Sequence, residues 1–367
     1  MPLRYPLLLI LCFINSCSSV NLQVAATSAT VCMDYNGSEL VLSDVRLTRE
    51  SGIKLAYQGY NNLEGPVWYE GALYYSNIGN RKDIATGDVV TNRTTIWRWV
   101  PGSEAEVWLD DSNAGTNGLA LDQRGNLIAA RHLDGSISQI GWQDKRIIPL
   151  TKTYNNKRFN SPNDLVVASD GTIYFTDPDW NVPSDIKQAI QGGESQHIYR
   201  ITNTGQVSKT DITSLVVQLK NKPNGIMLSL DESELLVAGL NGLWKFAITD
   251  TGVSSPKKLL TTPIDGLGKD CAGNIYVTTT IQSETGTSNQ VIRILNRHYE
   301  QVGDIAVPDI QIVTNVAFGG AQRNILYVTS LTVPDNDAGT GPRVCNGSPC
   351  KPAGIYSVEL NIPGFPY

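Results

Sequence analysis

An all-β fold, a six-bladed β-propeller, is predicted by two features of the 367-residue sequence: one phrase recurs six times, and strand-like runs separate the copies. Each copy has a polar residue, a short apolar strand, a turn rich in Gly, Asp and Asn, and a second apolar strand, which is typical of a β-hairpin. Runs such as "HIYRITNTG" between the copies add a second hairpin to each unit. Four strands at roughly 40 to 50 residue spacing are what a propeller blade requires.

The repeats extend along most of the chain. The copies begin at Glu64, Asn117, Asn163, Asn224, Asp265 and Asn315. Two stacked β-sandwiches would not explain one phrase from end to end, and no segment has the sustained period near 3.6 of a helical solenoid. The strand-like segments 52–57 and 354–364 flank the copies, so we expect a strand from the N-terminal side to complete the last blade. The propeller is expected to occupy residues 51–367, after a leader over 1–26 and an extension over 27–50.

The N-terminus resembles an export signal. Arg4 precedes the apolar run "PLLLILCFI", which is too short to span a bilayer in the mature chain. Ile14-Asn15-Ser16-Cys17 resembles a lipobox, in which Cys17 would be lipidated, and "VAA" at 24–26 is the alternative cleavage site. The expected location is therefore periplasmic, membrane-anchored as a lipoprotein, or secreted.

Composition narrows the class of ligand. The net charge is −6 and there is no Lys/Arg-rich run, which argues against a nucleic-acid partner and favours a small molecule. In an oxidising compartment Cys345 and Cys350 could close a small loop, and Cys32 with Cys271 is a second pair to consider. No Cys-x-x-Cys pair exists, which argues against a thiolate metal site.

The six polar residues that begin the copies, here called the strand-start residues, are expected to converge at the centre of the propeller, because the first strand of each blade lines that centre. Asn-Gly and Asp-Gly are common turn dipeptides, but the hairpin turns come later in each copy. Two carboxylates and several amide oxygens, without Cys or His, predict a site for one divalent cation, Ca²⁺ first, with Mg²⁺, Mn²⁺ or Zn²⁺ as alternatives. Without a cation, two buried carboxylates would repel each other.

Longer segments follow the second strand of several copies, and they are expected to gather over the strand-start residues. Loops at one end of a rigid scaffold usually carry binding, so a covered pocket with a metal at its floor is predicted.

Together these motifs resemble the family of senescence marker protein, gluconolactonase and luciferin-regenerating enzyme, most closely the gluconolactonase branch. The resemblance covers about residues 50–367 and rests on "EGPVW", "RFNSPNDLVVASDGTIYFTDPDW", "KPNGIMLSLDESELLVA", "DGLGKD", "TNVAFGG" and "GIYSVELNIPG". It implies a six-bladed propeller with a catalytic divalent cation, and hydrolysis of sugar lactones or related esters.

The resemblance also implies roles for individual residues. Glu64, Asn163, Asn224 and Asp265 match the metal ligands, and Asp265 also matches the catalytic proton carrier. Asn117 and His132 match positions near bound substrate, whereas Asn315 matches no metal ligand. Asp177 of "FTDP" is expected to stabilise a turn. Related lactonases often continue this motif with Tyr-Gly, where this chain has Asp179-Trp180-Asn181, so the lid over the substrate is expected to differ.

The leading hypothesis is a metal-dependent lactonase or carboxylic-ester hydrolase, in which Asp265 handles the proton of an attacking water. No Gly-x-Ser-x-Gly elbow is present for a serine hydrolase. Two alternatives stay open: a phosphotriesterase-like hydrolase on the same scaffold, and a non-enzymatic exported binding propeller stapled by its metal.

Overall fold

The computed structural model is all-β in the residues that it describes, as predicted. These are residues 32, 35–43, 45–54, 57–58, 61–79, 82–83, 93–111, 115–180, 196–210, 222–250, 252–282, 288–332, 344–345 and 348–366. The expected leader over 1–26 lies outside them. Within them, no helix has the length and hydropathy needed to cross a bilayer.

Four sheets contain four antiparallel strands each. The first is β8 (Thr116–Leu121), β9 (Leu127–Arg131), β10 (Ser136–Ile140) and β11 (Ile147–Thr151). The second is β14 (Leu165–Val167), β15 (Ile173–Asp177), β16 (His197–Ile201) and β17 (Val207–Thr210). The third is β18 (Pro223–Leu228), β19 (Glu234–Gly239), β20 (Gly242–Thr249) and β21 (Gly252–Leu260). The fourth is β22 (Ile264–Lys269), β23 (Ile275–Gln282), β24 (Ser288–Leu295) and β25 (Gln301–Val307).

An eight-stranded sheet joins the two ends of the chain. One part is β3 (Asn61–Tyr69), β4 (Ala72–Gly79), β6 (Arg93–Trp99) and β7 (Glu106–Asp110). The other is β26 (Ile312–Gly319), β27 (Ile325–Thr332), β30 (Ile355–Glu359) and β1 (Thr48–Arg49). The parts meet where Leu331 and Thr332 of β27 pair with Asn62 and Asn61 of β3. The N-terminal strand expected beside the C-terminal strand is thus β1, at 48–49, instead of the segment 52–57.

Three short strand pairs lie outside these sheets. They are β2 (Tyr57–Gln58) with β5 (Lys82–Asp83), β12 (Thr153–Tyr154) with β13 (Lys157–Arg158), and β28 (Val344–Cys345) with β29 (Ser348–Pro349).

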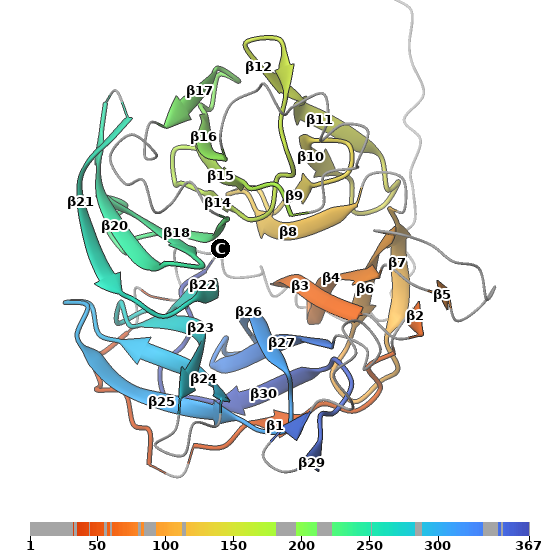
Figure 1. Ribbon diagram of the computed structural model, residues 1–367, viewed down its shortest axis with the longest axis vertical. Helices are drawn as coiled ribbons and strands as arrows, with labels where there is room; N and C mark the ends of the chain where they lie inside the picture. The colour runs from red at the N-terminus through yellow and green to blue at the C-terminus, as the bar shows by residue number, and fades with distance from the viewer. Residues whose placement is uncertain are drawn as a thin grey trace, which may run out of the picture.

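The sheets are arranged around a common centre in a propeller-like manner (Figure 1). The first strands β3, β8, β14, β18, β22 and β26 lie innermost, each contacts the next, and β26 contacts β3. We call the line that these six strands surround the central axis. Most of their residues are buried, because neighbouring sheets cover both faces of each inner strand. Apolar clusters fill the spaces between sheets, such as Val67 and Tyr74 packed with Leu119 and Leu127.

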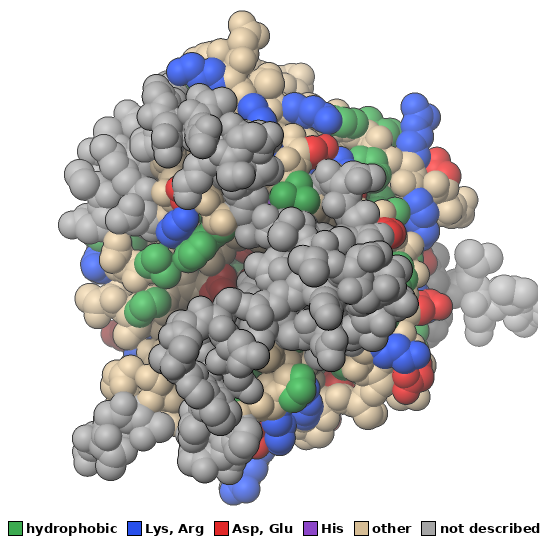
Figure 2. Space-filling view, turned by 45° about the vertical axis from the view of Figure 1, so that its right-hand side comes forward, with side chains coloured by type: hydrophobic (Ala, Val, Ile, Leu, Met, Phe, Trp, Pro, Cys, Tyr) green, Lys and Arg blue, Asp and Glu red, His purple; other side chains and the backbone are tan. Residues whose placement is uncertain are grey.

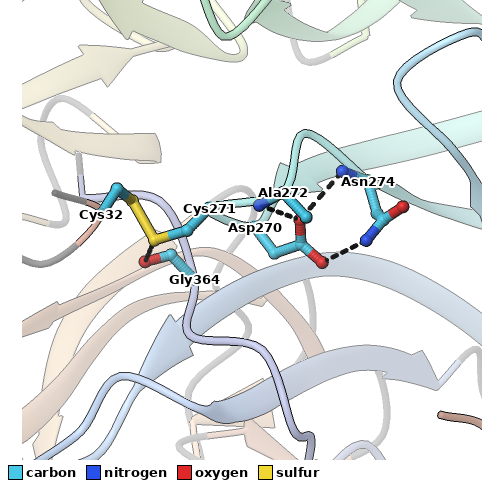
Figure 3. Close-up of a disulfide and its surroundings, with 6 residues drawn as sticks. All are labelled: Cys32, Asp270, Cys271, Ala272, Asn274 and Gly364. Atoms are coloured by element: carbon cyan, nitrogen blue, oxygen red, sulfur yellow. Dashed lines mark hydrogen bonds between the residues drawn. A yellow bond between two sulfur atoms is a disulfide. The ribbon is translucent and has the colours of Figure 1, made fainter. Parts of the chain in front are cut away.

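The C-terminal tail lies at the central axis (Figure 1). The backbone nitrogen of Cys271 donates to the carbonyl of Pro363 at 2.9 Å, and that of Phe365 donates to Lys269 at 2.9 Å. A disulfide joins Cys271 to Cys32 of the N-terminal extension, beside the Asp270–Asn274 turn (Figure 3). A second disulfide joins Cys345 to Cys350. Both cysteine pairs considered from the sequence are therefore confirmed.

Candidate functional site

A cavity of about 340 Å³ opens at one end of the central axis, and five strand-start residues line it. These five are Glu64, Asn117, Asn163, Asn224 and Asp265, as their shared position in the repeats predicts. The sixth, Asn315, lines instead a smaller cavity of about 100 Å³ further along the axis. The two carboxylates and three amides thus reach one space although they come from five separate copies of the repeat.

A β-bulge recurs where the strand-start residues lie. The pairing with the second strand shifts register at this point in five of the six first strands: between Glu64 and Val67, Thr116 and Leu119, Pro223 and Ile226, Ile264 and Leu267, and Val313 and Val316. A bulge leaves residues unpaired and re-aims a side chain. The same local distortion therefore explains why these polar side chains leave the sheet and face the axis.

Glycine after the strand-start residue allows the inner strands to approach one another closely. A Cβ on Gly65 would lie 2.3 Å from the carbonyl oxygen of Asn117, and one on Gly225 would lie 2.2 Å from that of Asp265. Either contact is far shorter than side-chain packing permits, so only glycine fits. Asn-Gly and Asp-Gly therefore serve close strand packing around the site.

The third copy departs from this pattern, because Asp164 stands where four other copies have glycine. Its Oδ1 accepts a hydrogen bond from the backbone nitrogen of Leu165 at 2.9 Å. The side chain of Asn315 hydrogen bonds to both Asp164 and Glu64. Since Oδ1 of Asn315 already accepts from the backbone nitrogen of Val316 at 2.8 Å, its amide nitrogen is the donor to the carboxylates. Asn315 thus links the floor of the cavity to a third acid, which the sequence analysis did not single out.

The carboxyl groups at the floor are electrostatically unfavourable as a set without a cation. Burial, followed by the charges of Asp265 and Asp164, raises the pKa of Glu64 well above its usual value. Burial and the charge of Asp164 raise the pKa of Asp265 to about 8, against a smaller opposing effect of its hydrogen bond with Asn224. Desolvation and like charges both disfavour the ionised forms. A bound divalent cation would offset both effects.

The donor set fits a hard divalent cation. Within the described residues, no three His, Cys, Asp or Glu side chains gather into a metal-binding group. Amide oxygens of asparagine would therefore have to supply part of the coordination, beside Glu64 and Asp265. Carboxylate and amide oxygens are the ligands that Ca²⁺ prefers.

Hydroxyl groups on the first and second strands hold neighbouring copies together beside the floor. Ser76 donates to the carbonyl of Asn117 at 2.7 Å. Thr314 donates to the carbonyl of Leu63 at 2.5 Å, and Thr278 donates to that of Thr314 at 3.0 Å. These bonds fix the backbone next to three strand-start residues, which makes the floor rigid.

The rim of the cavity contains part of the segment that follows "FTDP" in this chain. Trp180 lines the cavity and is 42% exposed. The amine of Lys222 lies 4.5 Å from the centre of the Trp180 ring and forms an ion pair with Asp179. Figure 2 shows a hollow on this face, with acidic atoms at depth and hydrophobic side chains beside it.

Asp177 supports the segment that leads to Asn163. It is fully buried, and its two carboxylate oxygens accept backbone hydrogen bonds from Asn160 at 2.9 Å and Ser161 at 2.7 Å. Burial raises its pKa to about 7. Asp177 therefore has a structural role, but its hydrogen bonds hold the segment before Asn163 instead of the turn at Pro178 that was expected.

His132 does not lie with the other predicted site residues. It follows β9, is completely buried, and is not among the described residues that line the cavity. Its ring nitrogens have no hydrogen-bond partner in the described part of the chain. Burial lowers its pKa to about 3, which keeps the imidazole neutral. The ring packs against Gly115, so the geometry gives no support to the substrate contact that was expected for His132.

Known proteins are similar to this chain in sequence and in fold. A gluconolactonase from Zymomonas mobilis is 25% identical over 217 residues, which cover 54% of this chain and 55% of the relative, so the match spans about half the length of each. The structure of a Xanthomonas campestris gluconolactonase matches with a TM-score of 0.62 and 24% identity, covering 87% of this chain and 91% of that one. A calcium-binding regucalcin from Agrobacterium tumefaciens matches with a TM-score of 0.56 and 16% identity, covering 86% of this chain and 97% of that one.

The family comparison covers the central part of the chain. Residues 63–332 match the SMP-30/Gluconolactonase/LRE-like region, a span that includes all six strand-start residues. Because this match extends over well more than half of the chain, the protein belongs to the SMP-30/Gluconolactonase/LRE-like family.

Proposed function

We propose that this chain is a divalent-metal-dependent hydrolase that opens a lactone or a related carboxylic ester in the 340 Å³ cavity. The observation that carries the proposal is the convergence of the carboxylates of Glu64 and Asp265 and three asparagine amides at the floor of an accessible cavity. Family membership and the similarity to gluconolactonases support the reaction class. We also propose a six-bladed propeller, in which the eight-stranded sheet counts as two blades joined through β27 and β3.

The proposed cation ligands are Glu64, Asn163, Asn224 and Asp265, and Ca²⁺ is the proposed ion, supported by the calcium-binding regucalcin neighbour. The raised pKa values of Glu64 and Asp265 support a cation at this position, because both groups would ionise more readily beside a positive charge. When bound, such an ion would polarise a carbonyl group as a Lewis acid.

The side chains of the cavity have distinct proposed roles in hydrolysis. Asp265, held by its hydrogen bond with Asn224, accepts the proton of a water molecule whose oxygen bonds to the carbonyl carbon. The ester C–O bond then breaks, and the proton returns to the leaving alkoxide, which yields a hydroxy acid from a lactone. Asn117 lies at the same floor and is proposed to orient the substrate.

The test is hydrolysis of a panel of lactones and aryl esters with and without a chelator, together with Asp265→Ala. Asp304→Ala serves as the control, because Asp304 pairs with Arg293 on an outer strand. We expect chelation and Asp265→Ala to abolish turnover and Asp304→Ala to retain it. Hydrolysis unaffected by both treatments would refute the mechanism.

The same assay separates the two alternatives. Turnover of phosphotriesters in place of lactones would indicate the phosphotriesterase-like reaction. A rise in thermal stability with metal, without turnover of any substrate, would indicate a binding propeller. The two disulfides support the further proposal that the chain is exported, since such bonds persist in oxidising compartments.

A further inference from the structure

The cavity has an apolar wall above its polar floor. Trp180, Leu240, Ile264, Ile312, Val313 and Leu331 line the same cavity as the carboxylates and amides. They come from the ends of β15, β19 and β27 and the starts of β22 and β26, so one wall of the mouth is largely hydrocarbon.

Most polar side chains beside this wall are engaged within the protein; the exception is Asn62, whose Oδ1 has no hydrogen-bond partner among the described residues. Thr279 donates to the carbonyl of Pro263 at 2.7 Å. Gln290 donates to Thr280 at 2.9 Å, and its side-chain oxygen accepts from the backbone nitrogen of Val313 at 3.1 Å. Among the described residues that line the cavity, none is Lys, Arg or His. This wall therefore offers few groups to bind the hydroxyls of a sugar.

Two of the apolar side chains are left largely in water. Leu240 is 47% exposed and Trp180 is 42% exposed. Lys222 holds the Trp180 ring from one side, so the ring is positioned without a ligand. Contact between a hydrocarbon group and these side chains would remove apolar surface from water, which is favourable. Because the Trp180 ring is already held in place, little side-chain entropy would be lost on binding.

The arrangement of floor and wall determines which part of a substrate meets which surface. The reacting carbonyl has to reach Asp265 and the amides at the floor, so its substituent extends along the wall toward Trp180 and Leu240. Hydroxyls placed there would lose hydrogen bonds to water without replacement, which is unfavourable. A hydrocarbon substituent would instead be buried favourably.

We propose that the substrate is a lactone or ester with an alkyl or aryl substituent next to the reacting ring or carbonyl group, in place of a polyhydroxylated sugar lactone. This inference rests on the proposed function, since it assumes that the reacting group lies at the carboxylate floor.

The experiment compares δ-lactones with the same ring and different substituents: δ-valerolactone, its 6-methyl, 6-propyl and 6-pentyl derivatives, and glucono-δ-lactone. Each kcat/KM is divided by the rate constant for hydroxide-catalysed hydrolysis, which removes differences in ring reactivity. We expect the normalised value to rise by about fourfold per added methylene until the chain passes the rim. An equal or higher value for glucono-δ-lactone than for the 6-pentyl lactone would overturn the inference while leaving the lactonase function intact.

A matched pair of variants tests the wall itself. Leu240→Asn should flatten the dependence of kcat/KM on chain length. Leu150→Asn is the control, because Leu150 is 38% exposed on the outer strand β11 and does not line the cavity. An unchanged chain-length dependence in Leu240→Asn would contradict the proposal.

Binding distinguishes failure of this inference from failure of the proposed function. Calorimetry with 6-alkyl δ-lactams, which resist hydrolysis, reports the apolar wall even if no lactone is turned over. Affinity that increases with chain length in the native chain and not in Leu240→Asn supports the wall as a hydrocarbon site. Affinity independent of chain length refutes it whether or not hydrolysis occurs.

Discussion

The two ends of the central axis are built from the same six strands and are completed in opposite ways. At one end, Glu64 and Asp265 face a cavity, and burial together with neighbouring negative charges makes their carboxyl groups favour the protonated form. At the other end, Phe365 and Pro366 of the C-terminal tail border a smaller cavity. We call these the open end and the sealed end.

Polar groups at the sealed end are satisfied within the protein. The amine of Lys269 donates to the carbonyls of Leu228 at 2.9 Å and Ser229 at 3.0 Å, and lies 4.2 Å from the centre of the Phe365 ring. The disulfide between Cys32 and Cys271 links this end to the N-terminal extension. The difference indicates that the sealed end supports stability, whereas the open end keeps oxygen ligands available at the expense of stability.

The largest expected effect on stability is removal of the disulfide at the sealed end. Cys32 and Cys271 are 239 residues apart, so the chain-entropy model predicts a loss of about 5 kcal/mol in the free energy of unfolding for the Cys32→Ser/Cys271→Ser variant. Urea unfolding measures the loss, and calorimetry measures cation affinity. We expect affinity to be unchanged in the folded variant.

The second disulfide is the control. Cys345 and Cys350 are five residues apart, and the same model predicts a loss of only about 2 kcal/mol for their double serine variant. Equal losses of unfolding free energy for the two variants would show that the disulfide at the sealed end stabilises the protein no more than the one that closes a short loop.

The next effect is at the open end. Glu64→Gln removes a carboxylate and keeps the size of the side chain, so cation affinity should fall by more than about a hundredfold, the upper range for loss of a group that only supports a ligand. Without cation, the variant should be at least as stable as the native chain, because one of the repelling acids is gone. Full cation affinity in Glu64→Gln would exclude this residue as a ligand.

The repeated phrase is sufficient to predict much of the open end. One position in a repeated strand fixes one place around the axis, and this placed Glu64, Asn117, Asn163, Asn224 and Asp265 beside one cavity without any distance information. The repeats also predict the all-β fold, because hairpin turns and alternating apolar residues can be recognised within short stretches of sequence.

What the sequence did not reveal depends on packing between distant segments. Asp164 was overlooked because Asn-Asp resembles the other copies until Asn315 is seen to bridge it to Glu64. His132 ends its strand near the expected face, but its ring turns into the protein beside Gly115. The repeat pattern could not predict that Phe365 borders the smaller cavity at the sealed end, because the C-terminal tail belongs to none of the six copies.

A smaller effect is expected from paired glycine substitutions. A Cβ on Gly225 would lie 2.2 Å from the carbonyl oxygen of Asp265, and a Cβ on Gly364 would lie 2.0 Å from the side-chain Cβ of Phe318. Each alanine variant should lose about 1–3 kcal/mol of stability through overpacking. Only Gly225→Ala displaces a proposed ligand, so only it should weaken cation binding, by about tenfold. Calorimetry that finds both variants equally impaired would mean that the two ends are not independent.

The pH dependence of stability also separates the two ends. Burial and the charge of Asp164 raise the pKa of Asp265 to about 8. Between about pH 4 and pH 8 the folded protein therefore holds a proton on Asp265 that the unfolded chain has released. The stability of the protein, measured with a chelator present, should fall as the pH rises through this range. Burial lowers the pKa of Lys269 to about 8 from 10.5, so stability should rise again between about pH 8 and pH 10.5. Calorimetric melting temperatures should show shifts of about 2–4 °C for each 1 kcal/mol.

Saturating Ca²⁺ should act on one limb of this pH profile and not on the other. Ca²⁺ should reduce the fall in stability below pH 8, because its positive charge would stabilise ionised Glu64 and Asp265. A residual fall in stability is expected from Asp177, whose pKa of about 7 is raised by burial away from the carboxylate floor. The rise above pH 8 should remain, since Lys269 belongs to the sealed end, and Lys269→Met should abolish that rise alone. If Ca²⁺ changed neither limb, the carboxylates at the open end would not be its ligands.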